Sequence, residues 1–498
     1  MNTPPPVVPA TPALPRQILA AFWILLAAST CLLVLARLVT WSFFFDGNIY
    51  ASTARNMAEG LGSAWSLNFS RTLFPIFAEH PPLMMWLEAV GFVIFGDTIA
   101  VEKGFSLLTF LAAGFILFKI WMRLNGNDAE MQRGAPFALL MTLIAGRINW
   151  AFGNGMLENL LIVLTSLAVF FVVTAYDERR RASLSSRAVL MGAAGLAIAL
   201  AVLTKGPVGL FPLAAPGLYW LSLKRPSFRA AAWDSLILLA VVALFYIILW
   251  SFEASRESLQ RYLNAQLLPS LAGERGFGGG GWTAVRTLIR VNAYPLIAAA
   301  VIIVVAGRRQ TTSVHSSLGM RRKRRAAYLF LLGCSASLPL LVSPRVASFY
   351  FNPSLAYFAA ALSIFCVPLI YEGLSKCGPR LQRCLYLGSV GLLAISLATV
   401  GWSFGRLGKD WQIIEAAEAI SSVVCTDRGS CPEMISACGS ALEDWALYAY
   451  MQRYYKISIA NAAMEDAKYL IADDSCQSNR SYTNTDVVAA PYRLLRLD

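Results

Sequence analysis

The chain has 498 residues, of which 57% are hydrophobic and only 14% are charged, and its formal net charge is +13. This composition excludes an ordinary soluble globule and predicts several membrane-spanning helices of about 17–25 residues each. Most of the positive charge lies in short loops between apolar segments, without a basic face that carries interleaved aromatic residues, so we expect no nucleic-acid partner.

The first 16 residues are rich in proline, which predicts a short disordered cytoplasmic tail. The apolar segment at 17–44 is too long for a removable signal peptide and lacks a small-residue cleavage site, so it predicts the first span. Ten further apolar segments have helical length, at 99–121, 134–151, 159–176, 188–204, 207–223, 231–251, 290–306, 326–343, 350–371 and 385–404. The sequence therefore predicts a transmembrane domain of about eleven helices over residues 17–404.

The placement of charge predicts how these spans are oriented. Four connecting loops carry clustered cations, at 177–187, 224–229, 308–325 and 376–383. All four lie in the cytoplasm if the N-terminus does. The apolar segment at 83–95 is only about thirteen residues long and contains Glu88, so we expect it to lie in the membrane interface. The loops at 45–98 and 251–287 and the region 405–498 then face outward.

The outward C-terminal region predicts a small α/β domain over residues 405–498. Helical patterns cover 411–424 and 442–455, and strand patterns cover 456–460 and 468–472. Four of the nine cysteines lie here, which predicts two disulfides in an oxidising compartment and leaves their pairing open. These residues are Cys425, Cys431, Cys438 and Cys476. A zinc site is the weaker alternative, because no Cys-x-x-Cys pair or nearby histidine accompanies them.

A polar loop directly follows the first span and begins with Asp46. A carboxylate at the mouth of a membrane helix is costly unless it is hydrated, paired or used. Arg55, Glu79 and His80 follow in the same loop. This pattern indicates chemistry at the membrane surface, although Asp46 could also serve only as a helix cap.

Four motifs in chain order resemble one family. The run from Asp46 to Met57 resembles the first outer loop of the GT-C membrane glycosyltransferases, in the branch of the lipid A aminoarabinose transferase and the protein O-mannosyltransferases. Residues 79–87 resemble that branch's Glu-Lys-Pro-Pro-Leu motif, and 204–207 match its Thr-Lys-Gly-Pro motif. Residues 343–353 resemble its later Lys/Arg, Tyr and Pro motif. The resemblance covers about residues 17–370.

This resemblance implies a polyprenyl-phosphate sugar as donor, because sugar nucleotides do not reach the outer face. It further implies a lipid acceptor, either lipid A or core lipopolysaccharide, and an active site on the periplasmic face of a bacterial inner membrane. The acceptor oxygen must be activated by a carboxylate, and cations must stabilise the departing lipid phosphate. We expect a monomer embedded in the bilayer.

The resemblance also implies the roles of individual residues. Asp46, Glu79 and Glu158 are the expected catalytic carboxylates. The expected contacts to the donor phosphate or substrate are Arg55, His80, Lys205, Arg275, Arg345 and Tyr350. His80 departs from the family's lysine, and together with Glu79 it is a candidate ligand for a divalent metal. The other histidine, His315, lies in a predicted cytoplasmic loop, which excludes a zinc site of several histidines.

Other readings of the same residues stay open. Glu158 could be only an acidic helix start, and Lys205 could extend to the interface. The acceptor could be protein Ser/Thr or a polysaccharide. A lipid-sugar transporter or flippase is the alternative of another class. Transporters tend to carry charges and broken helices near the bilayer midplane, whereas these spans contain few charges and no evident internal repeat.

Overall fold

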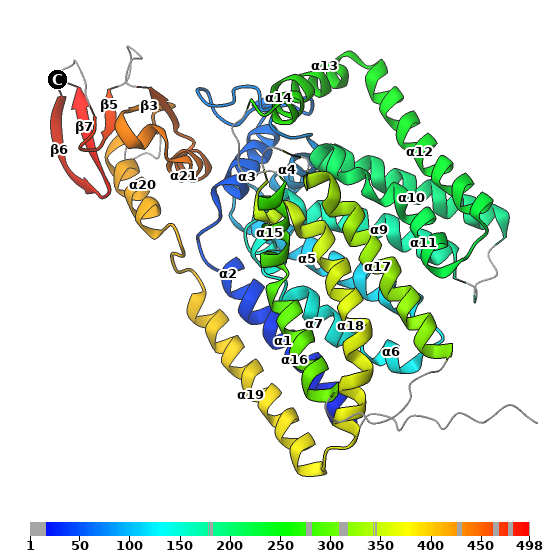
Figure 1. The fold of residues 1–498 in the computed structure, drawn as a ribbon. Helices are drawn as coiled ribbons and strands as arrows, with labels where there is room; N and C mark the ends of the chain where they lie inside the picture. Colours follow the sequence, from blue (N-terminus) through cyan, green and yellow to red (C-terminus); the bar gives the residue numbers. More distant parts are fainter. Residues whose placement is uncertain are drawn as a thin grey trace, which may run out of the picture.

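The computed structural model describes residues 16–177, 179, 183–274, 281–307, 317–341, 343, 346–425, 431–461, 468–476 and 482–497. These residues form a large helical bundle with a small α/β domain at one of its ends (Figure 1). The bundle contains α1 (Arg16–Thr30), α2 (Ala36–Leu38), α3 (Phe45–Ala58), α4 (Leu83–Phe95), α5 (Ala100–Leu124), α6 (Ala129–Arg133), α7 (Ala135–Leu143), α8 (Ile148–Phe152), α9 (Leu157–Ala175), α10 (Leu184–Lys205), α11 (Ala215–Leu223), α12 (Phe228–Ser251), α13 (Glu253–Tyr262), α14 (Leu268–Ala272), α15 (Trp282–Val291), α16 (Ala293–Gly307), α17 (Ser317–Leu341), α18 (Asn352–Ser375) and α19 (Pro379–Ser403). Shorter elements join them, namely the π-helices η1 (Cys31–Leu35) and η4 (Leu263–Leu267), the 3-10 helices η3 (Gly206–Ala214) and η5 (Ser348–Phe351), and the strands β1 (Gly62–Ser63) and β2 (Ser66–Leu67).

The number of possible membrane spans is smaller than the sequence predicts. In the described chain, 7 helical stretches are long and apolar enough to cross a membrane, or 8 if the bent pair α15 and α16 counts as one span. The prediction of about eleven spans is therefore not confirmed. Residues Ser185–Leu223 form one helical stretch where two segments were expected, α7 has only 9 residues, and α17 begins with the basic cluster at 321–325.

The chain nevertheless reverses direction inside the stretch Ser185–Leu223. Gly206 has φ +72°, in the left-handed region that favours glycine. At Gly209, an added Cβ would lie 2.7 Å from backbone atoms of Ala201 and Val202. The 3-10 helix η3 therefore packs back along α10, and Lys205 is left at the turn between them.

The two ends of the bundle differ in their charges. One end, which we call the domain-bearing end, lies beside the C-terminal domain and holds α3 and α4 (Figure 1). At the opposite end, buried acids pair with arginines that link neighbouring helices. Arg187 of α10 binds Asp234 of α12 at 2.5 Å, and Arg322 of α17 binds Asp128 before α6 at 2.8 Å. Cations at this end agree with a cytoplasmic location, although the orientation in the membrane stays a prediction.

Helix α4 corresponds to the segment expected in the membrane interface. It has 13 residues, too few to span a bilayer. Met84 and Met85 are fully buried, whereas Val93 and Phe95 are 70% and 72% exposed. This one-sided burial fits a helix that lies along the interface.

The C-terminal domain has the predicted α/β character. It contains α20 (Trp411–Val424), β3 (Met434–Ala437), η6 (Gly439–Leu442), α21 (Trp445–Tyr455), β4 (Ser458–Asn461), β5 (Tyr469–Ala472), β6 (Tyr482–Ala489) and β7 (Tyr492–Leu497). The sheet order is β4-β3-β5-β7-β6, with β3 parallel to β4 and β5 and with β7 antiparallel to β5 and β6. Both helices and the strands β4 and β5 were predicted within a few residues, whereas β3, β6 and β7 were not.

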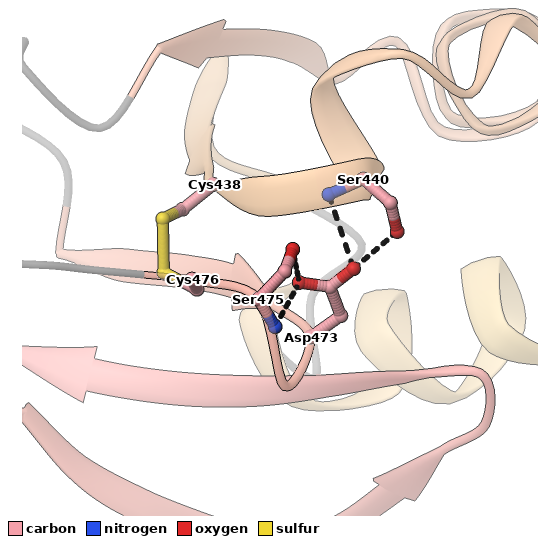
Figure 2. Close-up of a disulfide and its surroundings, with 5 residues drawn as sticks. All are labelled: Cys438, Ser440, Asp473, Ser475 and Cys476. Carbon is pink, nitrogen blue, oxygen red and sulfur yellow. Dashed lines mark hydrogen bonds between the residues drawn. A yellow bond between two sulfur atoms is a disulfide. The ribbon is translucent and has the colours of Figure 1, made fainter.

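Two disulfides form among the four cysteines of this domain, as predicted. Cys425 pairs with Cys431, and Cys438 pairs with Cys476. Figure 2 shows the second bridge, which joins the residue after β3 to the turn after β5. Beside it, the carboxylate of Asp473 accepts hydrogen bonds from the backbone N–H and the hydroxyl of both Ser440 and Ser475. These bonds lower the pKa of Asp473 to about 2.

Helix α21 attaches this domain to the bundle. The hydroxyl of Tyr450 donates to the carbonyl of Phe43 at 2.8 Å and accepts from its N–H at 3.2 Å. The hydroxyl of Tyr454 donates to the carbonyl of Trp41 at 2.8 Å. These bonds hold the segment that leads from the first span into α3, so the C-terminal domain helps to position whatever α3 carries.

Candidate active site

Asp46 lies in the first turn of α3, where the helix dipole favours a carboxylate. The start of this helix is pressed against the turn before α9. The N–H of Phe44 donates to Oδ1 of Asn154 at 3.0 Å, and a Cβ added at Gly47 would lie 2.2 Å from the carbonyl oxygen of Asn154. This close approach requires glycine at position 47, and it brings the expected base beside the start of α9.

Glu158 and Lys205 form a buried ion pair at the same end. Glu158 lies in the first turn of α9 with its side chain fully buried, and its Oε1 accepts from Nζ of Lys205, which is 9% exposed. Its Oε2 is buried without a hydrogen-bond partner among the described residues. Nζ of Lys205 also lies 4.9 Å from the ring centroid of Tyr350 and 5.5 Å from that of Phe349. Three expected site residues, Glu158, Lys205 and Tyr350, therefore form one cluster.

Tyr50 lies within the electrostatic influence of the expected carboxylates, one helical turn after Asp46 and on the same face of α3. Its side chain is buried, and burial raises its pKa well above the usual value; the negative charges of Asp46, Glu158 and Glu79 raise it further. The phenol therefore keeps its proton and can donate a hydrogen bond to an anion. The sequence motif contained this residue, and its i+4 spacing from Asp46 was the signal that could have identified it.

Glu79 and His80, which precede two prolines, lie near Tyr50 in the same cluster. The ring of His80 lies 5.7 Å from that of Tyr50 in an edge-to-face arrangement, and Glu79 contributes to the field at Tyr50. The structure therefore gathers most of the expected site residues at the domain-bearing end, and their roles stay predictions. They are Asp46, Glu79, His80, Glu158, Lys205 and Tyr350.

The segment 251–287 was expected to be an irregular loop, yet much of it is helical. Helix α13, the π-helix η4 and α14 follow one another from Glu253 to Ala272. The hydroxyl of Tyr262 lies 2.1 Å from where a Cβ at Gly206 would be, so this helix covers the turn that carries Lys205. Burial raises the pKa of Tyr262 to about 12, and the nearby Tyr350 contributes. The helical spacing of Leu259 and Tyr262 was the signal for this helix in the sequence.

Arg55 lies away from this cluster, at the contact with the C-terminal domain. Its side chain is 1% exposed, and its Nη1 donates to the carbonyl of Arg453 at 2.8 Å while Nε and Nη2 donate to Asn56. Asp97 lies 3.9 Å from Nη1. With its donors directed into this interface, the placement favours a structural role for Arg55 over the expected phosphate contact. The other expected phosphate contacts, Arg275 and Arg345, lie outside the described residues.

A metal ion at the expected site would find few protein ligands close together. Among the described residues, no three His, Cys, Asp or Glu side chains gather as they would around a metal ion. Glu79 and His80 would supply two ligands, and a divalent ion there would complete its shell with water or phosphate oxygens.

The chain is similar to known proteins both in sequence and in fold. Residues 79–250 match the family model described as dolichyl-phosphate-mannose-protein mannosyltransferase. The solved structure of ArnT from Cupriavidus metallidurans bound to undecaprenyl phosphate has a TM-score of 0.63 at 15% identity, covering 95% of this chain and 97% of that chain. Its apo state has a TM-score of 0.61 at 13% identity with the same coverage. No curated protein sequence gives a significant match.

A second solved protein shares the fold more distantly. The apo form of the Archaeoglobus fulgidus oligosaccharyltransferase has a TM-score of 0.53 at 15% identity, covering 92% of this chain and 69% of that chain. Together these structures show the GT-C fold that the motifs predict. The family match contains Glu79, His80, Glu158 and Lys205 and, with this fold, indicates a glycosyltransferase that uses a lipid-linked donor.

Proposed function

We propose that the protein transfers one sugar from a polyprenyl-phosphate donor to a lipid acceptor, either lipid A or core lipopolysaccharide, at the periplasmic face of a bacterial inner membrane. The observation that carries this proposal is the gathering of Asp46, Tyr50 and the Glu158–Lys205 pair at one end of the bundle. The described residues Arg187 and Arg322 lie at the other end, which supports a cytoplasmic location for that end. ArnT, whose fold is similar, was solved with undecaprenyl phosphate.

In this reaction an acceptor oxygen attacks the anomeric carbon of the donor sugar. The bond between that carbon and the phosphate oxygen breaks, and its electron pair leaves with the polyprenyl phosphate. Asp46 takes the proton if the attacking group is a hydroxyl. Lys205 stabilises the departing phosphate, and the protonated Tyr50 donates a hydrogen bond beside it.

The Glu158–Lys205 pair can exchange partners during such a cycle. Without a bound substrate, the carboxylate of Glu158 is the charged partner of the buried Lys205. An arriving phosphate would compete with Glu158 for the three donors of the ammonium group. Because Tyr350 and Phe349 already flank Nζ, the phosphate would approach past these rings.

Asp46→Asn tests the catalytic assignment. Membranes that contain this variant at the wild-type level should lose transfer from polyprenyl-phosphate sugars, measured by mass spectrometry of the lipid products. The matched control is Asp474→Asn, because Asp474 is a highly exposed carboxylate of the C-terminal domain. Full transfer by Asp46→Asn would remove Asp46 from the mechanism.

The acceptor and the orientation have their own tests. In a deletion strain, lipid A should lose one sugar while total glycoprotein stays unchanged; the reverse result would favour a protein acceptor, the alternative that the matched family description supports.

For the orientation, a cysteine at the exposed position Leu61 should react with an impermeant reagent in intact cells, whereas one at Lys323 should not. Labelling only at position 323 would refute the periplasmic site.

A further inference from the structure

Three arginines gather at the domain-bearing end, beside the site described above. Nη1 of Arg37 donates to Oδ1 of Asn149 at 3.0 Å, two residues after Arg147. The N–H of Gly146 donates to the carbonyl of Val291 at 3.2 Å, which joins the residue before Arg147 to the residue after Arg290. Three elements far apart in sequence, α2, the turn before α8 and α15, therefore bring these cations together.

Among the residues that the structure describes, these guanidinium groups have no carboxylate partner. Within the described ranges, no ion pair involves any of the three. Burial lowers the pKa of Arg147, and the positive charge of Arg290 lowers it further. Arg37 and Arg147 likewise repel each other. Cations that are held together against their own repulsion form an attractive site for an anion.

An apolar groove begins directly below this arginine cluster. It has a volume of about 550 Å³, within the range of pockets that hold small molecules. Ile148, next to Arg147, lines it, as does Phe152, next to Gly153, where an added Cβ would lie 3.1 Å from the side chain of Arg37. Apart from Thr30, Cys31 and Thr142, the described side chains that line it are apolar or glycine.

The groove opens toward the bilayer between α1 and α5. Trp23 lines it from α1 and is 42% exposed, and Leu111 and Phe115 line it from α5 and are 55% and 61% exposed. A cationic site above a laterally open apolar groove has the two parts that a phosphate-bearing lipid needs, because the chain can enter from the bilayer while the phosphate stays at the interface.

Two aromatic rings join this second cation site to the candidate active site. The ring of Trp150 stacks on that of Phe349 at 5.7 Å. Arg147 lies 5.1 Å from the Trp150 ring centroid, and Lys205 lies 5.5 Å from the Phe349 ring centroid. The ring of Phe44, two residues before Asp46, lies 5.0 Å from Trp150. A lipid held by the arginines would therefore present its headgroup close to the expected base.

We propose that the arginine cluster and the groove below it form the acceptor site, which binds a membrane lipid through a phosphate on Arg37, Arg147 and Arg290 and through a hydrocarbon chain in the groove. The assignment as acceptor rests on the proposed transfer reaction. A reaction between two lipids, each with a phosphate, needs two separate anion sites, and Lys205 supplies the other.

Binding without turnover tests the site independently of the enzyme activity. Native mass spectrometry of the purified full-length protein with added phosphatidic acid should show binding above that of phosphatidylcholine. The double variant Arg147→Gln/Arg290→Gln should bind phosphatidic acid at least about tenfold more weakly, since each charged hydrogen bond contributes of the order of one such factor. The matched control Arg380→Gln/Arg383→Gln removes two exposed arginines of α19 and should bind as the wild type does.

A second variant fills the groove and leaves the charges in place. An added Cβ at Gly114, which lines the groove, would meet no atom within 4 Å, so Gly114→Leu can fold. It should weaken phosphatidic acid binding, whereas Gly391→Leu on α19, where the space is equally open, should not. Unchanged binding in both test variants, or equal loss in the controls, would overturn the site.

Kinetics distinguish the acceptor from the donor. With saturating donor, Arg147→Gln/Arg290→Gln should raise the acceptor KM at least about tenfold and leave the donor KM unchanged. A rise in the donor KM alone would overturn the assignment as acceptor site. If Asp46→Asn retains transfer while the lipid binding follows the pattern above, the mechanism fails and the lipid site stands.

Discussion

Arg453 carries the main electrostatic contact between the C-terminal domain and the bundle, and its replacement should undock the domain locally. Its side chain is 3% exposed and forms a two-point contact with Glu102, from Nε to Oε1 at 2.9 Å and from Nη2 to Oε2 at 3.1 Å. Nη1 binds Asp97 at 2.6 Å. Glu102 is itself 1% exposed, so Arg453→Met leaves a buried carboxylate without its counter-charge.

The expected cost is about 3–5 kcal/mol, as for other buried pairs that lose one partner. Tyr450 and Tyr454 flank Arg453 on α21 and hold the segment before Asp46, so weaker docking should free that segment. Hydrogen exchange of residues 41–46 should accelerate by roughly 100-fold or more, because about 1.4 kcal/mol corresponds to each tenfold change. Transfer should fall with it, since Asp46 loses its fixed position.

Two further variants serve as a control and as a rescue for Arg453→Met. Arg493→Met removes an arginine that is 63% exposed and paired with the 85% exposed Asp474, so exchange at 41–46 should stay at the wild-type rate. Arg453→Met/Glu102→Gln removes the stranded charge as well and should recover part of the protection. If Arg453→Met leaves exchange at 41–46 unchanged, the domain does not position α3 through this contact.

Two other predictions concern stability. Burial raises the pKa of Glu88 in α4 well above its usual value, with Glu102 contributing; its carboxyl therefore favours the folded state below the unfolded pKa of about 4.3, and this contribution is lost as the pH rises. Thermal unfolding of Glu88→Gln should accordingly show its largest gain over the wild type at alkaline pH, and an equal difference at pH 4 and pH 8 would contradict the buried-carboxyl explanation. The Cys438–Cys476 bridge closes 38 residues and the Cys425–Cys431 bridge closes 6, so chain entropy assigns them about 4 and about 2 kcal/mol respectively. Replacing both cysteines of the Cys438–Cys476 bridge by serine should lower the unfolding temperature more than the same change at Cys425–Cys431. A larger decrease for Cys425–Cys431 would exclude loop entropy as the main cause.

The sequence predicted which polar residues lie together at this end of the bundle better than it predicted their surroundings. Asp46, Glu158 and Lys205 could be named as candidates because motif residues at the ends of apolar segments mark the membrane surface. Arg55 shows the limit of that reasoning. Its charge suggested a phosphate contact, but its partner is a carbonyl nearly four hundred residues later, on α21. Such a contact depends on how the C-terminal domain docks, and no local pattern carries that information.

The fold shows the same contrast between local and long-range information. Periodicity located most apolar segments, α20 and α21, because each is a local pattern. The short helix α7 and the continuous helical stretch through Gly206 lowered the span count, and both depend on how close the backbones approach. Strand β3 was missed because four residues in the middle of a sheet carry little alternation of their own.

The described buried acids that pair with a cation differ in one respect that bears on function. Asp128, Asp234 and Glu102 each use both carboxylate oxygens to accept hydrogen bonds from their arginines or neighbouring groups. Within the described part of the chain, Glu158 differs from them: it uses one oxygen for Lys205 and leaves the other buried without a hydrogen bond. A fully satisfied pair has nothing to gain from a new partner, whereas an incomplete one can accept a hydrogen bond from an incoming hydroxyl. This incompleteness, at the end that also holds Asp46 and Tyr50, supports the proposal that the Glu158–Lys205 pair exchanges partners with a substrate.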